Sequence, residues 1–573
     1  MSWARPRAAS APTWPTTSRP TDVEEGGATG GRGEAGGYAW DFPLRRERHY
    51  GERVVACFPD RPPHLHAMLA AALAARPDAE ALILDDGAPA RRRLTWAELD
   101  REVRGLAAGL AAAGVGQGDR VAILLGNGLE FVALAYAVAR LGAVLVPLST
   151  RDQTPGLRHA LTNSGARLVV AEPDAAARLP DPAETPALTR RFALGADPVP
   201  GFEPYAALRA DPDAAPPAAE PEEDAPATIL YTSGTTGTPK GAVLTHLGLI
   251  HSSLIYNRTC RLTADDRMCV VAPLSHVTGL VAGLHAAMAA GAPLIVIRDF
   301  KAARFLATAA AERMSFVVLV PAMYNLLLHQ DDPAAHDLSA WRLGLFGGAP
   351  MPAPTIERMA AKVPSLGLVN CYGATETSSP ITVMRAEETS ARRLSVGLPA
   401  PGAEIVVMDD DGRECPPGVH GELWHRGANV VPGYWENPEA TAREFCAGFW
   451  KSGDIGSKDA DGFVHVHDRK KDMINRGGFK IFTAQVEGVL HDFPGVVEAA
   501  VIAKPCPVLG ERVHAVLVAP DGPLSEPALA AHCAAALADY QRPESFTFRT
   551  DPLPRNANGK IMKREIRAAL GFG

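Results

Sequence analysis

Hydrophobic residues recur at helical spacing in the segment that follows Thr95. Thr95 and Glu98 have the spacing of a capping box, in which each side chain bonds the other residue's backbone N–H. Leucine and valine side chains then fall on one face of a helix that ends at Gly114, at positions 99, 103, 106 and 110. The pattern predicts an amphipathic helix that packs against a core.

Short apolar runs alternate with helical patterns along most of the chain. The first runs are 121–125, 143–146 and 168–170, separated by helical patterns at 129–141 and 154–162. The segment 180–226 is acidic and rich in Pro and Ala, and we interpret it as an exposed connection. Further runs follow at 227–231, 268–271, 294–297, 316–320 and 343–346. Alternation of this kind predicts an α/β fold with parallel sheets covered by helices.

The pattern changes after Asp454 to short strands at 496–502 and 513–518 and one helix at about 526–539. A chain of 573 residues also exceeds what one hydrophobic core usually supports. We therefore expect a small α+β domain of roughly a hundred residues at the C-terminal end. The N-terminal residues are rich in Ala, Pro, Gly, Ser and Thr and predict a disordered extension, which we place at 1–50.

Charge and cysteine content limit the partners that we expect. The formal net charge is -8, so no global field attracts nucleic acid. None of the eight cysteines forms a CxxC pair or has zinc-ligand spacing, which predicts reduced thiols and a cytoplasmic protein. The sequence has no secretory signal and no apolar window of 18 residues, so we expect no transmembrane anchor.

The segment 231–241 combines three glycines, five Ser and Thr hydroxyls and one lysine. Glycines allow backbone N–H groups to converge on an anion, hydroxyls add donors, and the lysine adds a positive charge. Pro239 and Gly241 flank the lysine where a Walker A loop needs Gly and Ser or Thr. We predict a different phosphate-binding loop, made by Thr232, Ser233, Gly234, Thr235, Thr236, Gly237 and Lys240.

This loop resembles that of the adenylate-forming superfamily, which includes acyl-CoA synthetases, peptide-synthetase adenylation domains and luciferases. Further motifs of the superfamily occur in its order at 273–279, 370–376, 451–454, 468–472 and 554–560. The chain is most similar to fatty-acid or aryl-acid CoA ligases. The resemblance implies a large N-terminal AMP-binding domain at 51–469, with mostly parallel sheets and a small β-barrel-like part. It also implies a small mobile C-terminal domain at 470–573.

The resemblance implies an ATP-dependent acyl-CoA synthetase with ATP, Mg²⁺ and CoA. Attack of a carboxylate on the α-phosphate of ATP brings two anions together and needs positive charges nearby. Glu376 is then the magnesium ligand and Thr375 a phosphate donor. Tyr372 stacks on adenine, and Asp454 binds the ribose hydroxyls with Arg469 beside it. Other expected nucleotide contacts are Gly348, Ala349, Pro350, Asn370 and Gly373.

Residues of the C-terminal part receive roles from the same resemblance. Lys560 follows a glycine near the C-terminus and would be the catalytic lysine that bridges the substrate carboxylate and the α-phosphate. Lys471 matches the hinge about which the small domain rotates between the two half-reactions. The loop with Gly477, Gly478 and Lys480 would then face CoA.

The acid substrate is predicted from the segment around His276, which matches a gate between the acyl pocket and the thiol tunnel. Amino-acid-activating relatives place Asp at the next position for the substrate ammonium, whereas this chain has Val277. An ammonium group opposite valine would be buried without a partner, which excludes an amino acid. We expect a fatty or arylalkanoic acid in a pocket that includes Val277, Val281 and Gly347.

The sequence leaves other functions open. The acceptor could be the phosphopantetheine of an acyl-carrier protein instead of free CoA. A luciferase-type monooxygenase shares all of the adenylation motifs. A non-catalytic ATP-binding interaction protein would be expected to lack Lys240, Glu376 or Lys560, and all three are present.

Overall fold

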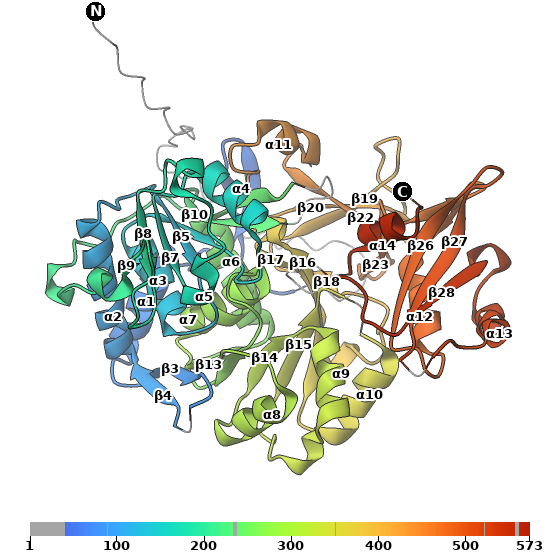
Figure 1. Cartoon of the computed structure of the whole chain (residues 1–573), viewed down its shortest axis with the longest axis horizontal. Helices are drawn as coiled ribbons and strands as arrows, with labels where there is room; N and C mark the ends of the chain where they lie inside the picture. The colour runs from blue at the N-terminus through green and yellow to red at the C-terminus, as the bar shows by residue number, and fades with distance from the viewer. Residues whose placement is uncertain are drawn as a thin grey trace, which may run out of the picture.

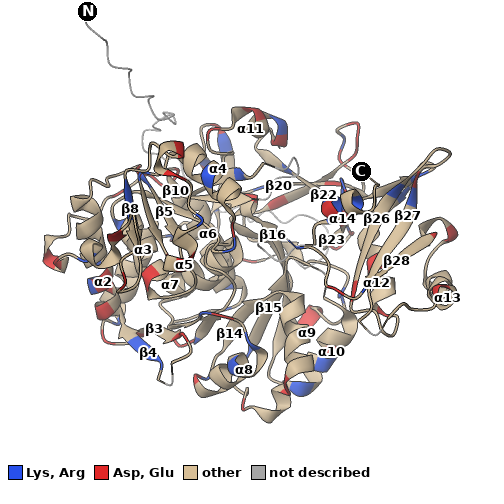
Figure 2. Ribbon diagram, viewed as in Figure 1, with Lys and Arg blue, Asp and Glu red and all other residues tan. Residues whose placement is uncertain are grey.

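The computed structural model describes residues 40–88, 90–232, 238–349, 351–520, 522–555 and 561–572. Among the described residues, a large body holds three sheets of five or more strands and a two-stranded hairpin, and a smaller C-terminal body lies at one end of it (Figure 1). Lys and Arg are interspersed with Asp and Glu over both bodies (Figure 2). Within the described residues, no helix is both long and apolar enough to cross a bilayer.

The prediction of disorder for 1–50 is wrong at its C-terminal end, and 1–39 lie outside the described residues. β1 (Arg45–His49) and β2 (Arg53–Cys57) form an antiparallel hairpin. Its buried side chains include Glu47 and His49, so the segment lacks the apolar alternation that predicts a strand. The Arg53 guanidinium donates to the carbonyls of Val431 and Pro432, both at 3.0 Å.

The first sheet has seven strands in the order β11-β10-β6-β5-β7-β8-β9, and only the β10–β11 pair is antiparallel. The strands are β5 (Arg120–Leu124), β6 (Val144–Pro147), β7 (Leu168–Ala171), β8 (Arg190–Ala193), β9 (Glu203–Pro204), β10 (Pro226–Thr232) and β11 (Lys240–Thr245). The helices of this region are α2 (Trp96–Ala112), α3 (Leu129–Arg140), α4 (Thr154–Ser164) and α5 (Pro173–Ala176). The expected capping box of Thr95 and Glu98 starts α2.

The second sheet has nine strands in the order β18-β17-β16-β15-β14-β12-β13-β3-β4, with antiparallel strands only at its edges. The strands are β3 (Glu80–Asp85), β4 (Arg92–Thr95), β12 (Met268–Val270), β13 (Leu294–Ile297), β14 (Phe316–Leu319), β15 (Leu343–Gly347), β16 (Gly367–Ala374), β17 (Ser379–Val383) and β18 (Leu398–Pro399). Its helices are α1 (Leu65–Ala75), α6 (His246–Thr259), α7 (Ala286–Ala290), α8 (Ala302–Ala311), α9 (Pro321–Gln330) and α10 (Ala353–Lys362).

The third sheet is antiparallel and occupies the place of the predicted barrel-like part. It contains β19 (Glu404–Met408), β20 (Gly421–Arg426), β21 (Phe445–Cys446), β22 (Phe449–Lys458) and β23 (Val464–Arg469), and α11 (Pro438–Glu444) precedes β21. The long strand β22 carries Asp454 and β23 ends at Arg469, so two predicted ligands lie opposite each other in register.

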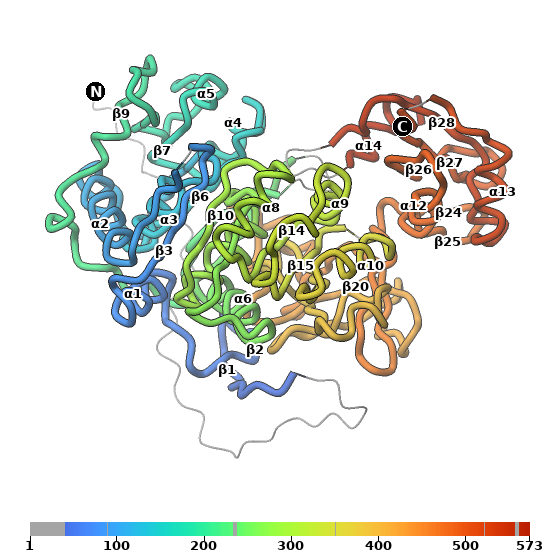
Figure 3. The backbone as a smooth tube through the Cα atoms, turned by 90° about the horizontal axis from the view of Figure 1, so that it is seen from below, coloured from blue at the N-terminus to red at the C-terminus, as the bar shows by residue number. Residues whose placement is uncertain are grey.

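The small domain follows β23 and has its own sheet and core (Figure 3). Its strands are β24 (Ile474–Arg476), β25 (Phe479–Ile481), β26 (Glu498–Cys506), β27 (Gly510–Val518) and β28 (Ser545–Arg549), and its helices are α12 (Thr483–His491), α13 (Glu526–Ala536) and α14 (Lys563–Ala569). Lys480 contacts Asp410 of the large domain at 3.2 Å.

Two segments differ from the expected pattern. The connection 180–226 contains β8 and β9, which extend the first sheet. The helical pattern after Gly279 is a π-helix, Thr278–His285, that continues into α7. A Cβ on Gly279 would lie 2.2 Å from the Pro273 carbonyl, so glycine is required where this helix approaches the preceding turn. Neither feature has a local sequence signal.

Candidate active site

The predicted phosphate loop joins two antiparallel strands at the edge of the first sheet. Thr232 ends β10, Lys240 begins β11, and the two residues face each other in register. The Thr232 hydroxyl donates to the Lys240 carbonyl at 3.4 Å. The predicted ligands between these strands, Ser233, Gly234, Thr235, Thr236 and Gly237, lie outside the described residues.

The ammonium group of Lys240 is buried beside Tyr434 and Glu444. Lys240 Nζ donates to the Tyr434 hydroxyl at 3.2 Å, lies 4.2 Å from the centre of the Tyr434 ring and forms an ion pair with Glu444. The Tyr434 segment is fixed because the Trp435 N–H donates to the Gly241 carbonyl at 2.7 Å. This lysine therefore has a defined position next to the loop.

Glu376 lies on the other side of Tyr434, in the 3-10 turn Thr375–Thr377. The Tyr434 hydroxyl lies 2.9 Å from Glu376 Oε1 and 2.7 Å from Glu444 Oε2. Burial raises the pKa of Glu376. A carboxylate oxygen is a suitable ligand for Mg²⁺, and an ammonium group attracts phosphate oxygens. Glu376 and Lys240, buried on either side of Tyr434, therefore fit the predicted binding of Mg²⁺ together with the phosphates of ATP.

The backbone around Glu376 is strained. Ser378 and Ser379, which follow the turn, have φ of 49° and 105°, values that side-chain-bearing residues rarely adopt. A Cβ on Gly373 would lie 1.6 Å from the Ser379 carbonyl oxygen, so no other residue fits there. Strain held in place by packing is typical of functional turns.

Asp454, Tyr372 and Arg469 form a second cluster. Asp454 is 3% exposed, accepts from the Tyr372 hydroxyl at 2.5 Å and lies 2.6 Å from Arg469 Nε. Tyr372 OH also lies 3.1 Å from His425 Nε2. The structure thus brings together the residues predicted for adenine and ribose.

Gly347, predicted for the acyl pocket, and the predicted nucleotide residues Gly348, Ala349 and Asn370 belong to β15, to the segment directly after it and to β16. Gly347 ends β15, and a Cβ there would lie 2.3 Å from the Cys371 carbonyl oxygen. Gly348 has φ +78° and precedes Ala349, whereas Pro350 lies outside the described residues. The Asn370 amide donates to the Ser395 carbonyl at 3.0 Å.

His276 and the predicted acyl-pocket valines lie at the start of the π-helix. The His276 N–H donates to the Pro273 carbonyl at 3.0 Å, and burial lowers the pKa of its imidazole to about 4. The ring is therefore neutral at pH 7. Val277 and Val281 are 5% and 0% exposed, with no carboxylate at position 277 to pair with an ammonium group.

The small-domain residues lie on exposed turns. Lys471 is exposed and follows β23. Gly477 and Gly478 form the two-residue turn between β24 and β25, with φ of 58° and 94°. A turn of this kind needs positive φ at both positions, which glycine allows. Lys560 lies outside the described residues, as do its four preceding neighbours.

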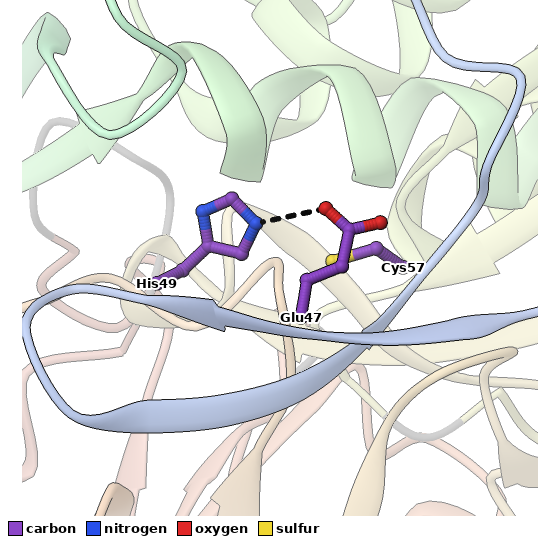
Figure 4. Close-up of side chains that lie close together, drawn as sticks. All are labelled: Glu47, His49 and Cys57. Carbon is purple, nitrogen blue, oxygen red and sulfur yellow. Dashed lines mark hydrogen bonds and ion pairs between the residues drawn. The ribbon is translucent and has the colours of Figure 1, made fainter. Parts of the chain in front are cut away.

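A second group of potential metal ligands lies in the N-terminal hairpin (Figure 4). Glu47, His49 and Cys57 are buried, and their ligand atoms lie within 4.8 Å of one another. However, Arg61 donates to both oxygens of Glu47, at 3.0 and 2.7 Å, and His49 Nδ1 lies 2.8 Å from Asp224. A guanidinium at the carboxylate opposes a second cation, so we interpret this group as a buried charge network.

Two site residues, Tyr434 and Glu444, were missed from the sequence. Tyr434 follows Gly433 in an aromatic pair, Tyr-Trp, which was the one available signal. Glu444 stands in a charged helix and has no such signal. Both reach the site because the chain after β20 folds back onto the edge of β11.

Comparison with known families identifies the family to which the chain belongs. The model of the AMP-binding enzymes matches residues 69–435, and that of the AMP-binding enzyme C-terminal domain matches 485–560. The chain belongs to the AMP-binding enzymes. The resemblance and the fold predicted from the sequence are thereby confirmed.

Similar AMP-binding enzymes include CoA ligases. A feruloyl-CoA synthase of Amycolatopsis sp is 38% identical over 83% of this chain and 94% of its own length. The long-chain-fatty-acid–CoA ligase FadD13 of Mycobacterium tuberculosis is 34% identical over 83% and 93%. The structure of o-succinylbenzoate CoA synthetase from Bacillus subtilis with its acyl-adenylate intermediate has a TM-score of 0.77 at 30% identity, covering 88% of this chain and 98% of that one.

Proposed function

We propose that this protein activates an apolar carboxylic acid, either aryl-substituted or fatty, and transfers the acyl group to CoA. The chain is an ATP-dependent, AMP-forming acyl-CoA synthetase. In the first half-reaction the acid carboxylate attacks the α-phosphate of ATP, giving acyl-AMP and pyrophosphate. In the second half-reaction the CoA thiol attacks the acyl carbon and AMP leaves.

The observation that carries the choice of acid is that the side chains at the start of the π-helix are apolar or neutral. Val277 and Val281 are buried and His276 is neutral. An acid with a charged group near its carboxylate would lose hydration there without gaining a partner. The names of two relatives, which specify a feruloyl and a long-chain fatty acyl group, support the same class.

The contacts around Tyr434 and Asp454 support roles for their neighbouring residues in binding ATP. Tyr434 places Lys240 and Glu376 on either side of one hydroxyl, where phosphates and Mg²⁺ would be shared between them. Magnesium would supply charge for the departing pyrophosphate. Asp454 and Arg469 would orient the ribose, so that the α-phosphate faces the acid.

The test is pyrophosphate release from Mg-ATP with ferulic, cinnamic, phenylpropanoic, benzoic, fatty and amino acids, each with and without CoA. We expect turnover with one apolar class and only when CoA is present. A burst of pyrophosphate that the addition of CoA does not convert into turnover would indicate a carrier protein as acceptor. Absence of release with every acid would contradict the proposal.

A further inference from the structure

Glu444 contacts the ATP side of the candidate site although no motif includes it. It is the last residue of α11, and its side chain is 18% exposed. One carboxylate oxygen contacts Lys240 Nζ and the Tyr434 hydroxyl, and the other accepts from Arg443 at 2.9 Å. The residue therefore links the phosphate loop to a helix of the third sheet.

Lys240 is the partner for which this carboxylate matters most. The lysine side chain is 8% exposed, so its ammonium has lost most of its water. In the part of the chain that the structure describes, the carboxylate that pairs with it is Glu444. Glu376 lies one step further away, beyond the Tyr434 hydroxyl.

This ion pair conflicts with ATP binding. An ammonium has three N–H donors, and Lys240 directs two of them toward Glu444 and Tyr434. Phosphates that approach this lysine meet the negative charge of Glu444, which repels them at close range. Either the phosphates displace the carboxylate from Lys240 or they share the ammonium with it.

We propose that Glu444 is an acidic latch on Lys240. Its carboxylate releases the Lys240 ammonium when the outer two phosphates of ATP bind there, and it pairs with the ammonium again when pyrophosphate leaves. The inference rests on the proposed function, in which Lys240 is a phosphate ligand. The outer phosphates are the partners because Lys560 is expected at the α-phosphate. The latch keeps a buried ammonium paired between turnovers and weakens retention of pyrophosphate.

A purely structural role for Glu444 predicts something else. A carboxylate that only anchors the end of α11 would, when removed, loosen the Tyr434 segment and weaken every nucleotide. An exchange latch affects only ligands that carry phosphates beyond the first. AMP and ATP therefore separate the two roles.

The experiment compares Glu444→Gln with the wild-type full chain in Mg²⁺ without acid, using calorimetric Kd values for ATP, pyrophosphate and AMP. Glu444→Gln removes the negative charge that competes with the phosphates for Lys240. We therefore expect the Kd values for ATP and pyrophosphate to fall about tenfold and the Kd for AMP to stay unchanged. Glu439→Gln is the matched control, because Glu439 is exposed on the same helix. Equal shifts for all three ligands, or no shift, would overturn the latch.

A double-mutant cycle tests the route of the effect. In a Lys240→Met background, Glu444→Gln is expected to leave ATP binding unchanged, because the latch has lost its partner. An effect that persists there would contradict the proposal. Glu444→Asp shortens the carboxylate by one methylene and provides a milder variant, with a smaller shift in the same direction, should the glutamine variant not fold.

Failure of the latch is distinguishable from failure of the proposed function. A wild-type protein that binds no ATP, or releases no pyrophosphate with any acid, contradicts the function. A wild-type protein that binds ATP and turns over, while Glu444→Gln binds ATP and pyrophosphate as before, contradicts the latch alone.

Discussion

At Asp454 a single carboxylate accepts from a tyrosine hydroxyl and an arginine, both within 2.6 Å. Replacing it by Asn keeps the shape but directs a neutral amide at Arg469. Hydrogen bonds to charged groups contribute about 1.5–3 kcal/mol, so we expect Asp454→Asn to raise KM for ATP about 10- to 100-fold. Steady-state pyrophosphate release measures this change.

Asp461→Asn is the control for this prediction, because Asp461 is half-exposed in the neighbouring turn and pairs with Arg392. Its KM for ATP is expected to equal that of the wild type. An unchanged KM in Asp454→Asn would exclude a ribose contact at this residue.

The raised pKa of His49 leads us to expect that the stability of the fold depends on pH. Burial lowers the pKa of His49, but the hydrogen bond and charge of Asp224 outweigh it and raise the pKa to about 10. The unfolded imidazole titrates near pH 6.5. Between these values only the folded state holds the proton, so the stabilisation present below pH 6.5 is lost as the pH rises toward 10.

The groups around this imidazole are Glu47, Asp224, Cys57 and Arg61. We expect the thermal midpoint of the wild type to approach that of His49→Gln as the pH rises from 6.5 to 9.5. The slope is at most about 1.4 kcal/mol per pH unit. A difference between the two proteins that stays constant over this range would show that His49 does not hold the extra proton.

Among elements, the contact between β16 and β17 sets the position of Glu376. A methyl group at Gly373 would overlap the Ser379 carbonyl, so Gly373→Ala must separate the strands. We expect a loss of more than about 3 kcal/mol in the free energy of unfolding and loss of pyrophosphate release. Urea denaturation and the activity assay measure the two effects.

Gly488→Ala is the matched comparison, because a Cβ at this position in α12 meets nothing within 4 Å. Here alanine is expected to stabilise the helix by about 1 kcal/mol. Tolerance of alanine at both positions would mean that the β16–β17 contact does not constrain the site.

Elements with local signals were predictable from the sequence, and those fixed by tertiary contacts were not. The capping box at Thr95 determines where α2 starts. In contrast, β1 buries charged side chains that are compensated by Arg61, 14 residues from Glu47, and by Asp224, 175 residues from His49. The site divides in the same way: Lys240, Glu376 and Asp454 stand in motifs, whereas Glu444 reaches the site only through the folding of α11.

At the scale of the whole molecule, the small domain is joined to the large one at the exposed Lys471, which remains a predicted hinge. We expect Lys471→Pro to restrict rotation by fixing φ. Pyrophosphate release in a single turnover should persist, while CoA-dependent turnover falls about tenfold or more. Rapid-quench measurement of both half-reactions tests this.

Lys471→Ala removes the side chain without fixing φ and is expected to retain both half-reactions. The backbone N–H of Lys471 is among the described groups without a backbone hydrogen bond, so proline removes no such contact. An equal loss of both half-reactions in Lys471→Pro would indicate misfolding or a different hinge.

The N-terminal hairpin has a consequence for recombination between relatives. The matched family segments begin at residue 69, yet Arg53 supports the carbonyls of Val431 and Pro432, just before Tyr434. A chimera joined at residue 69 would combine the N-terminal hairpin of one parent with the remaining chain of the other. The residue at position 53 and the carbonyls that it contacts beside the phosphate site would then come from different proteins. A crossover placed before β1 keeps the support and the site in one inherited unit.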